Sequence, residues 1–281
     1  MFDYVNTFLE HPREMLLFLA MALPGRLLAI SAHEFGHAWV AYRCGDPTAK
    51  QMGRLTLNPL KHLDPIGALM MLFLGFGWAK PVPVNPGNFR HPRRDDLKVS
   101  LAGVDMNAIL FLTGCLGMYA WLAGFFGSLE SVPMARLRDG VAAITTYTDG
   151  SVCLFDGEYL YTIRDLMRNA PYLGGGFLEP LQGKAASVVY QMLGYFVQTN
   201  LALFVFNLIP MPPLDGYHVV NDLLLKQDLF AGRKAMQICT AIMFALMLTG
   251  VLSKGMGIAI DWVFSRVGDV ANAAFAALGL V

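Results

Sequence analysis

Charged residues are scarce in this chain. Of its 281 residues only 15% are Asp, Glu, Lys or Arg, whereas soluble domains average about 25%. The 21 basic residues balance the 21 acidic ones, so the sequence lacks the net positive charge typical of proteins that bind nucleic acid. Hydrophobic residues make up 55% of the chain and its mean hydropathy is +0.47. The composition therefore predicts a protein that is partly solvated by a lipid bilayer.

Paired cysteines and the residue pattern of a cleavable leader are also missing. The four cysteines (Cys44, Cys115, Cys153 and Cys239) lie far apart and form no C-x-x-C pair, which excludes a disulfide scaffold and a cysteine-based zinc site. The first fifteen residues mix acidic and basic side chains and have neither a positive n-region nor a small-residue cleavage site. We therefore expect no cleaved signal peptide.

Long apolar stretches are what the chain has instead. A transmembrane helix needs ~20 mostly apolar residues, and three stretches satisfy this requirement: Val99–Gly127, Ala185–Leu214 and Ala235–Ser253. Nearer the N-terminus a helix is expected over about Leu27–Tyr42, with an unsettled helical segment before the Pro24-Gly25 break. These segments predict a protein that crosses the membrane several times.

Shorter segments complete the predicted architecture. Ile66–Trp78 is apolar but too short to span, which favours a re-entrant or interfacial segment, and Gly257–Val281 could lie on the membrane or cross it. Strand-like pieces occur at Arg54–Leu57 and Lys80–Pro86, and a hairpin is expected around Asp156-Gly157. The fold class is therefore an all-α polytopic membrane protein with small β elements in its loops. We expect one domain over residues 1–281, in which 128–184 is an extracytoplasmic insert and not an independent domain.

The segment SAHEFGHAWVAY contains the pattern H-E-x-x-H. On a helix His33 and His37 lie on one face about one turn apart, so both imidazoles can bind one metal ion. Glu34 is rotated away from that face, as suits a general base acting on water. Zinc is the expected metal, since catalytic zinc takes three protein ligands and keeps one position open. Ionisable groups in so apolar a stretch are functional by default.

Basic residues indicate which side of the membrane the loops face. Nine Lys and Arg residues lie between Arg43 and Lys98, and three more lie at Lys226, Arg233 and Lys234. By the positive-inside rule both loops face the cytoplasm. The histidines and Asp215 then lie toward the cytoplasmic ends of their helices.

Asp215 is the best candidate for the third ligand. It follows thirty uncharged residues and lies in NLIPMPPLDGYH, where three prolines break the helix and free backbone groups that need protein or water as partners. An interfacial Asp that only caps a turn before Gly216 is the alternative. Asp46 and Asp64 lie in polar loops and are expected to be turn residues.

These residues resemble the site-2 protease family of intramembrane zinc metalloproteases, in its short bacterial branch. The resemblance rests on HEFGH at His33–His37 and N-x-x-P-x-x-x-L-D-G at Asn207–Gly216, together with RLTLNPLKHLDPIG and GFGWAKPVPVNP between them. It implies His33, His37 and Asp215 as ligands of one zinc ion per chain and Glu34 as catalytic base. A G-x-x-x-N motif matches Gly103 and Asn107, and implies that Asn107 holds the substrate carbonyl or oxyanion.

The resemblance also implies the biological setting. The expected activity is hydrolysis of peptide bonds in or near transmembrane segments of membrane proteins, in a bacterial plasma membrane, with the site toward the cytoplasm. The expected partners are membrane protein or peptide substrates and the lipid bilayer, but no nucleic acid. A metal-binding transporter or assembly partner stays open as an alternative. However, it would not need Glu34, and no transporter-like repeats are visible. A degenerate protease that only binds is a second alternative.

Overall fold

The computed structural model describes residues 8–74, 77–129, 143–146, 152–155, 160–162, 184–225 and 232–277. The chain divides into two compact units. The first consists of Met1–Leu110 and Thr199–Gly257, and the second of Phe111–Gln198 and Ile258–Val281. The candidate site lies wholly in the first unit. The expectation of a single domain stays a prediction.

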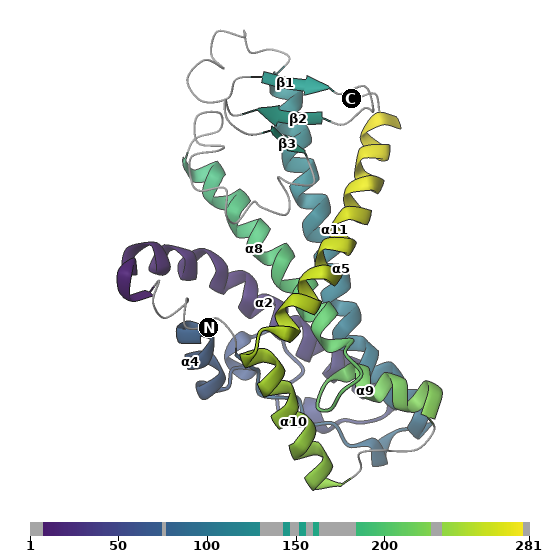
Figure 1. Cartoon of the computed structure of the whole chain (residues 1–281). Helices are drawn as coiled ribbons and strands as arrows, with labels where there is room; N and C mark the ends of the chain where they lie inside the picture. The colour runs from purple at the N-terminus through teal and green to yellow at the C-terminus, as the bar shows by residue number, and fades with distance from the viewer. Residues whose placement is uncertain are drawn as a thin grey trace. The chain divides into compact units, whose positions relative to one another are not determined.

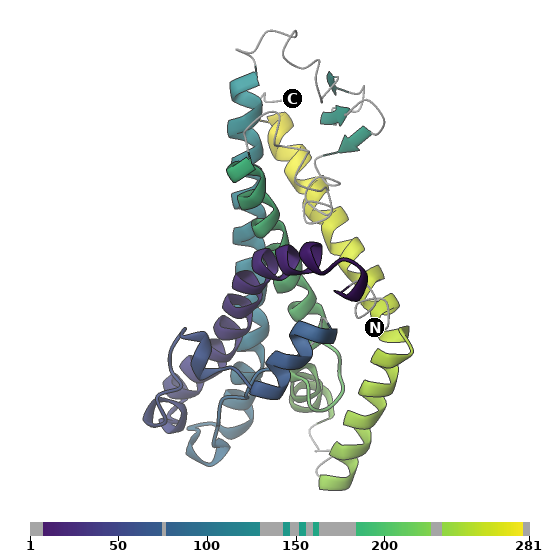
Figure 2. The same cartoon turned by 90° about the vertical axis from the view of Figure 1, so that its left-hand side faces the viewer.

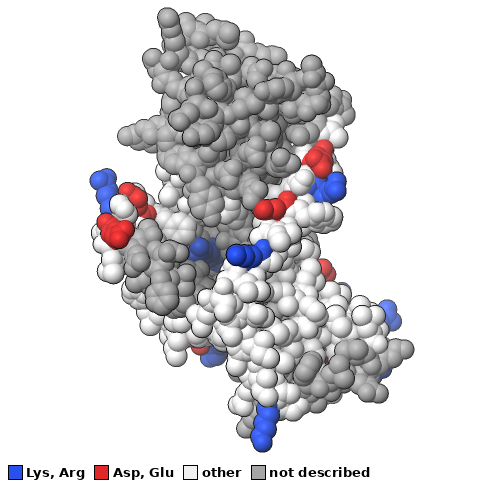
Figure 3. Space-filling view, viewed as in Figure 1, with Lys and Arg blue, Asp and Glu red and all other residues white. Residues whose placement is uncertain are grey.

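Helices dominate the described chain (Figure 1). Three are long and apolar enough to cross a membrane: α2 (Pro12–Cys44), α5 (Pro92–Leu129) and α8 (Lys184–Asn207). A fourth candidate span is a bent pair, α10 (Arg233–Leu248) with α11 (Val251–Ala277). The described surface seen in Figure 3 carries only scattered charged side chains. The predicted all-α polytopic class is confirmed.

Helix α2 departs from the sequence prediction at Pro24. The helix does not break at Pro24-Gly25 but runs without interruption from Pro12 to Cys44. Figure 2 shows that its axis changes direction along its length, as a proline inside a helix commonly causes. Proline removes one intrahelical hydrogen bond, which membrane helices tolerate when neighbouring groups compensate.

The apolar stretch Ala235–Ser253, predicted as a span, is bent near its C-terminal end. Helix α10 ends at Leu248, and α11 starts at Val251 at an angle of 76° to it. Gly250 lies between them with φ +74, a left-handed conformation that glycine adopts without steric cost. The described part of the tail, up to Ala277, belongs to α11.

Short elements connect α2 to α5. They are α3 (Thr48–Gln51), η1 (Pro59–Lys61), α4 (Pro65–Leu74) and η2 (Pro86–Asn88). Helix α4 has ten residues, too few to span a bilayer, so its re-entrant placement stays a prediction. The strands expected at Arg54–Leu57 and Lys80–Pro86 do not form.

In the connection between α2 and α5 the buried Arg54 side chain makes a hydrogen bond between the two segments that were expected to be strands. The Arg54 guanidinium donates to the Lys80 carbonyl at 2.6 Å, and the ladder there is reduced to one antiparallel bridge between Leu63 and Ala79. Real strands occur elsewhere. The strands β1 (Ala143–Thr146), β2 (Val152–Phe155) and β3 (Leu160–Thr162) form an antiparallel sheet in the order β1-β2-β3. The pair β2 and β3 confirms the hairpin predicted around Asp156-Gly157, whose turn lies outside the described residues.

Glycines allow close approach at two points in the first unit. A Cβ on Gly36 of α2 would lie 2.6 Å from the Ala102 carbonyl oxygen of α5. A Cβ on Gly216 would overlap the Leu208 carbonyl at the end of α8. Any larger residue would push these segments apart. The first contact places α5 beside the H-E-x-x-H turn, and the second holds α9 (Asp215–Val220) against the end of α8.

The two unexplained charges in predicted spans have different surroundings. Asp105 lies exposed on α5, which agrees with its expected position on the helix surface. The Arg26 guanidinium lies 5.2 Å from the centre of the Phe18 ring, so part of its charge is stabilised by the ring face.

Candidate metal centre

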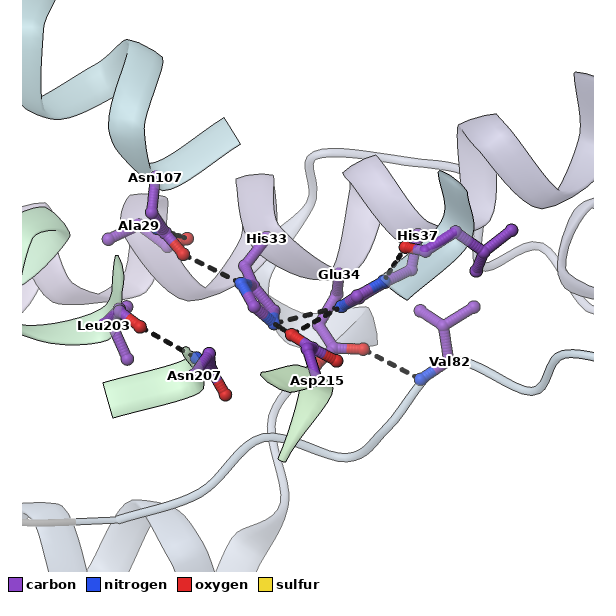
Figure 4. A network of polar contacts seen from close by, with 10 residues as sticks. Ala29, His33, Glu34, His37, Val82, Asn107, Leu203, Asn207 and Asp215 are labelled. Atoms are coloured by element: carbon purple, nitrogen blue, oxygen red, sulfur yellow. Dashed lines mark hydrogen bonds and ion pairs between the residues drawn. The ribbon is translucent and has the colours of Figure 1, made fainter. Parts of the chain in front are cut away.

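Three side chains from two distant parts of the chain converge in the first unit (Figure 4). His33 and His37 lie one turn apart in α2, and Asp215 is the first residue of α9. The two Nε2 atoms are 3.0 Å apart. Asp215 Oδ2 lies 3.3 Å from His33 Nε2 and 3.4 Å from His37 Nε2. The convergence expected from the sequence is therefore present.

Hydrogen bonds on the far side of each ring determine which nitrogen faces the cluster. His33 Nδ1 lies 2.8 Å from Asn107 Oδ1, and His37 Nδ1 lies 2.7 Å from the Val99 carbonyl oxygen. Both partners are acceptors, so each Nδ1 carries the proton and donates. Each Nε2 then points a lone pair at the cluster, which is the tautomer that metal-binding histidines use.

The geometry fits a small tetrahedral cation. Zinc bonds of ~2.0–2.2 Å to nitrogen and oxygen place neighbouring ligand atoms about 3.3 Å apart, close to the three separations found here. Among the described residues no hydrogen-bond donor reaches the buried Asp215 Oδ2. Without a cation, two lone pairs and a carboxylate oxygen would repel one another at this range. Gly103 makes room for the rings, because a Cβ there would overlap His37 Nε2.

Glu34 lies beside the cluster without belonging to it. Its Oε2 accepts a hydrogen bond of 2.8 Å from the Val82 backbone N–H, and only 9% of the residue is exposed. Figure 4 shows the carboxylate between the ligand cluster and the Val82 segment. One carboxylate oxygen is thereby held in place beside the ligand cluster.

Asp46 holds the Val82 segment in place from the other end. This carboxylate is fully buried and accepts hydrogen bonds from Thr48 (backbone and hydroxyl), from the Asn85 N–H and from Asn88 Nδ2. Burial alone would raise the pKa of Asp46, but these donated hydrogen bonds lower it below its ordinary value. The turn role expected for Asp46 is confirmed, and its partners extend to the loop that contacts Glu34.

Asn107 lies behind His33 and not at the open side of the cluster. Its Oδ1 accepts from His33, and its Nδ2 donates to the Ala29 carbonyl at 3.2 Å and to Asn200 Oδ1 at 3.0 Å. Both N–H bonds of this amide therefore have partners within the protein. The expected role of Asn107 at the substrate oxyanion stays a prediction, and it requires that one of these bonds be exchanged.

The remaining polar residues near the site have structural partners. Asp64 accepts from the Gly67 N–H, and His62 Nε2 lies 2.8 Å from the Thr56 carbonyl oxygen. His218 pairs with Asp96 at 3.5 Å, which raises the pKa of His218 despite its burial.

Sequence reasoning missed Val82, Val99 and Asn200. The first two act through backbone atoms, which residue type does not reveal. Asn200 had a signal, because it is a polar residue in the middle of an apolar helix.

Comparisons with known proteins agree with this geometry. The profile described as peptidase family M50 matches residues 24–250. YwhC of Bacillus subtilis, whose name designates a zinc metalloprotease, is 35% identical over 220 residues, covering 78% of this chain and 75% of its own. Rip2 of Mycolicibacterium smegmatis, also named as a zinc metalloprotease, is 26% identical over 251 residues, covering 88% and 74%. No solved structure matches the chain significantly.

Proposed function

The chain belongs to peptidase family M50 and is an intramembrane zinc metalloprotease, and on that premise we propose a role for each residue of the candidate centre. His33, His37 and Asp215 hold one zinc ion per chain, and Glu34 is the catalytic base. The observation that carries this proposal is the set of three ligand-atom separations of 3.0–3.4 Å, which suit tetrahedral zinc.

A zinc ion held by His33, His37 and Asp215 would supply Lewis acidity for peptide hydrolysis. Glu34 would accept a proton from the attacking water and later deliver it to the leaving amine. The Val82 N–H bonds one oxygen of the Glu34 carboxylate, so the carboxylate is oriented before substrate binds. The other ring nitrogens remain engaged with Asn107 and Val99, which prevents either imidazole from turning.

The substrates of this protease family are proteins, and we place the cleaved bond in or near a membrane-spanning segment. A helical substrate hides its carbonyls in i to i−4 hydrogen bonds, so it must unwind locally before attack. Gly and Pro in the substrate helix should ease this step. The Lys80–Pro86 segment lies against Glu34, and an extended substrate strand is expected to pair along it or along Arg54–Leu57.

Metal removal tests the assignment of one zinc ion. We expect the protein purified in detergent to contain one zinc per chain and to cleave a membrane-spanning reporter. Dialysis against a strong chelator should remove both the zinc and the cleavage. One equivalent of zinc should restore cleavage, while magnesium should not, because the nitrogen ligands disfavour it. Cleavage that persists in metal-free protein would rule out the proposed chemistry.

We further propose that the centre lies toward the cytoplasmic side. The cluster contacts the C-terminal part of α2 and the N-terminal part of α5, and Asp215 follows the end of α8. These helix ends adjoin the basic connections, which the positive-inside rule assigns to the cytoplasm.

Cysteine labelling tests this orientation. In a cysteine-free chain, Lys61→Cys should react with a membrane-impermeant maleimide in inverted vesicles and not in right-side-out vesicles. Asp149→Cys in the 128–184 insert should show the reverse. Labelling of Lys61→Cys from the outside would invert the proposed topology.

A further inference from the structure

Two buried amides lie in series behind His33. Asn107 on α5 and Asn200 on α8 have exposed fractions of 0%. Asn200 Oδ1 accepts from Asn107 Nδ2 at 3.0 Å, and Asn107 Oδ1 in turn lies 2.8 Å from His33 Nδ1. The second N–H of Asn107 points to the Ala29 carbonyl oxygen at 3.2 Å. The Asn107 side chain is therefore bonded to His33 and Ala29 on α2, which Figure 4 shows, and to Asn200 on α8.

The orientation of the Asn107 amide decides the tautomer of His33. An amide has one acceptor end and one donor end, so rotating it by half a turn exchanges them. In the rotated state the NH₂ group would face His33 Nδ1, and the oxygen would face two acceptor oxygens. His33 would then carry its proton on Nε2. A protonated Nε2 has no lone pair for a metal, so the ring could not be a ligand.

Asn200 supplies the contact that disfavours this rotation. Asn107 Nδ2 has two acceptors. One is the Ala29 carbonyl oxygen, which in a helix also accepts from the backbone N–H four residues later. Its distance from Nδ2, 3.2 Å, is longer than the 3.0 Å to Asn200 Oδ1. The Asn200 oxygen gives the other N–H a full partner at a shorter distance. Without the Asn200 acceptor only the Ala29 contact would oppose the rotation, so the preference for one orientation would be smaller.

We propose that Asn200 is a positioning residue for the metal centre, which acts through Asn107 to keep His33 Nε2 unprotonated and directed at the metal. This inference rests on the proposed role of His33 as a ligand. Asn200 touches neither the ligand atoms nor Glu34 in the contacts described above, and it lies fifteen residues before Asp215 in the chain.

Two substitutions at position 200 separate orientation from packing. Asn200→Leu keeps the size of the side chain and removes the acceptor, so the Kd for zinc should rise roughly 10–100-fold, as loss of an outer-shell partner commonly causes. Asn200→Asp keeps an acceptor oxygen for Asn107 in either protonation state, so its Kd should stay within about threefold of the unsubstituted protein. Zinc affinity is measured in detergent by competition with a chelator of known affinity.

A neighbouring position provides the matched control. Leu201 is as buried as Asn200 on the same helix, and Leu201→Ala should lower thermal stability through a cavity without changing the Kd for zinc. The tautomer is observed directly by ¹⁵N NMR of metal-free, histidine-labelled protein. The His33 signal, identified by its absence in His33→Gln, should report protonated Nδ1 in the unsubstituted protein and a measurably larger share of protonated Nε2 in Asn200→Leu.

The outcomes distinguish this inference from the proposed function. If the unsubstituted protein binds no zinc, the metal centre itself is wrong. If it binds zinc and Asn200→Leu binds zinc equally well with an unchanged His33 signal, only the role of Asn200 is overturned. Equal losses in Asn200→Leu and Asn200→Asp, or a loss of affinity in Leu201→Ala as large as in Asn200→Leu, would also overturn it.

Discussion

Replacing Glu34 with glutamine should lower the cleavage rate of a membrane-spanning reporter by roughly 10²–10⁴-fold, the usual contribution of a general base, while zinc content stays at one per chain. Glutamine has nearly the size of glutamate, and its oxygen can still accept the Val82 N–H that Glu34 Oε2 accepts now. It has no basic oxygen to take a proton from water. The reaction therefore loses its base while the local packing is kept.

The control for this experiment is a second glutamate on the same helix. Glu14 lies in the first turn of α2, its side chain is 77% exposed, and it is far along the helix from the ligands. Glu14→Gln should leave cleavage and zinc content unchanged. If Glu34→Gln cleaves the reporter at the unsubstituted rate, the mechanism is wrong. If it loses zinc as well as activity, Glu34 acts as a ligand or supports one.

Replacing Asp215 with alanine should remove zinc from the purified protein and abolish cleavage. Losing an outer-shell partner commonly costs 10–100-fold in metal affinity, and losing one of three ligands should cost more. The two imidazoles would remain, since their Nδ1 atoms are held by Asn107 and Val99. A two-nitrogen site holds zinc far more weakly than the three-ligand sites of catalytic zinc. Zinc is measured by elemental analysis after gel filtration.

Asp105 is the matched control for that substitution. It is another carboxylate in an apolar stretch, and it lies exposed on α5. Asp105→Ala should keep both zinc and cleavage. Stoichiometric zinc in Asp215→Ala would mean that the third ligand is another residue. Loss of zinc in both variants would point to general destabilisation, which a thermal unfolding measurement on each variant would reveal.

Much of the fold was predictable because it follows from local sequence patterns, namely the length of apolar stretches and turn signals. The apolar lengths predicted the spans that became α5 and α8 and a third that became α10 with the start of α11. In α2 only the helix over about Leu27–Tyr42 was expected. The Asp-Gly signal predicted the pairing of β2 with β3. The predictions were wrong where the packed chain supplied hydrogen-bond partners that local sequence patterns do not show. Proline ends many helices in water, but Pro24 lies inside the uninterrupted helix α2. The strand-like segments around Arg54 and Lys80 do not become strands, and the Arg54 guanidinium donates to the Lys80 carbonyl between them.

The sequence by itself determined the candidate metal ligands. The spacing of His33 and His37 puts two imidazoles on one face of any helix, and Asp215 at a helix break in apolar surroundings requires a compensating partner. Only the tertiary structure decided which nitrogen of each ring faces the cluster, which backbone N–H holds Glu34, and that Asn200 lies behind Asn107. Spacing along one helix is a property of the backbone and is encoded locally. Contacts between helices depend on how closely the helices approach at glycines such as Gly36 and Gly103. These distances are fixed only when the helices pack together.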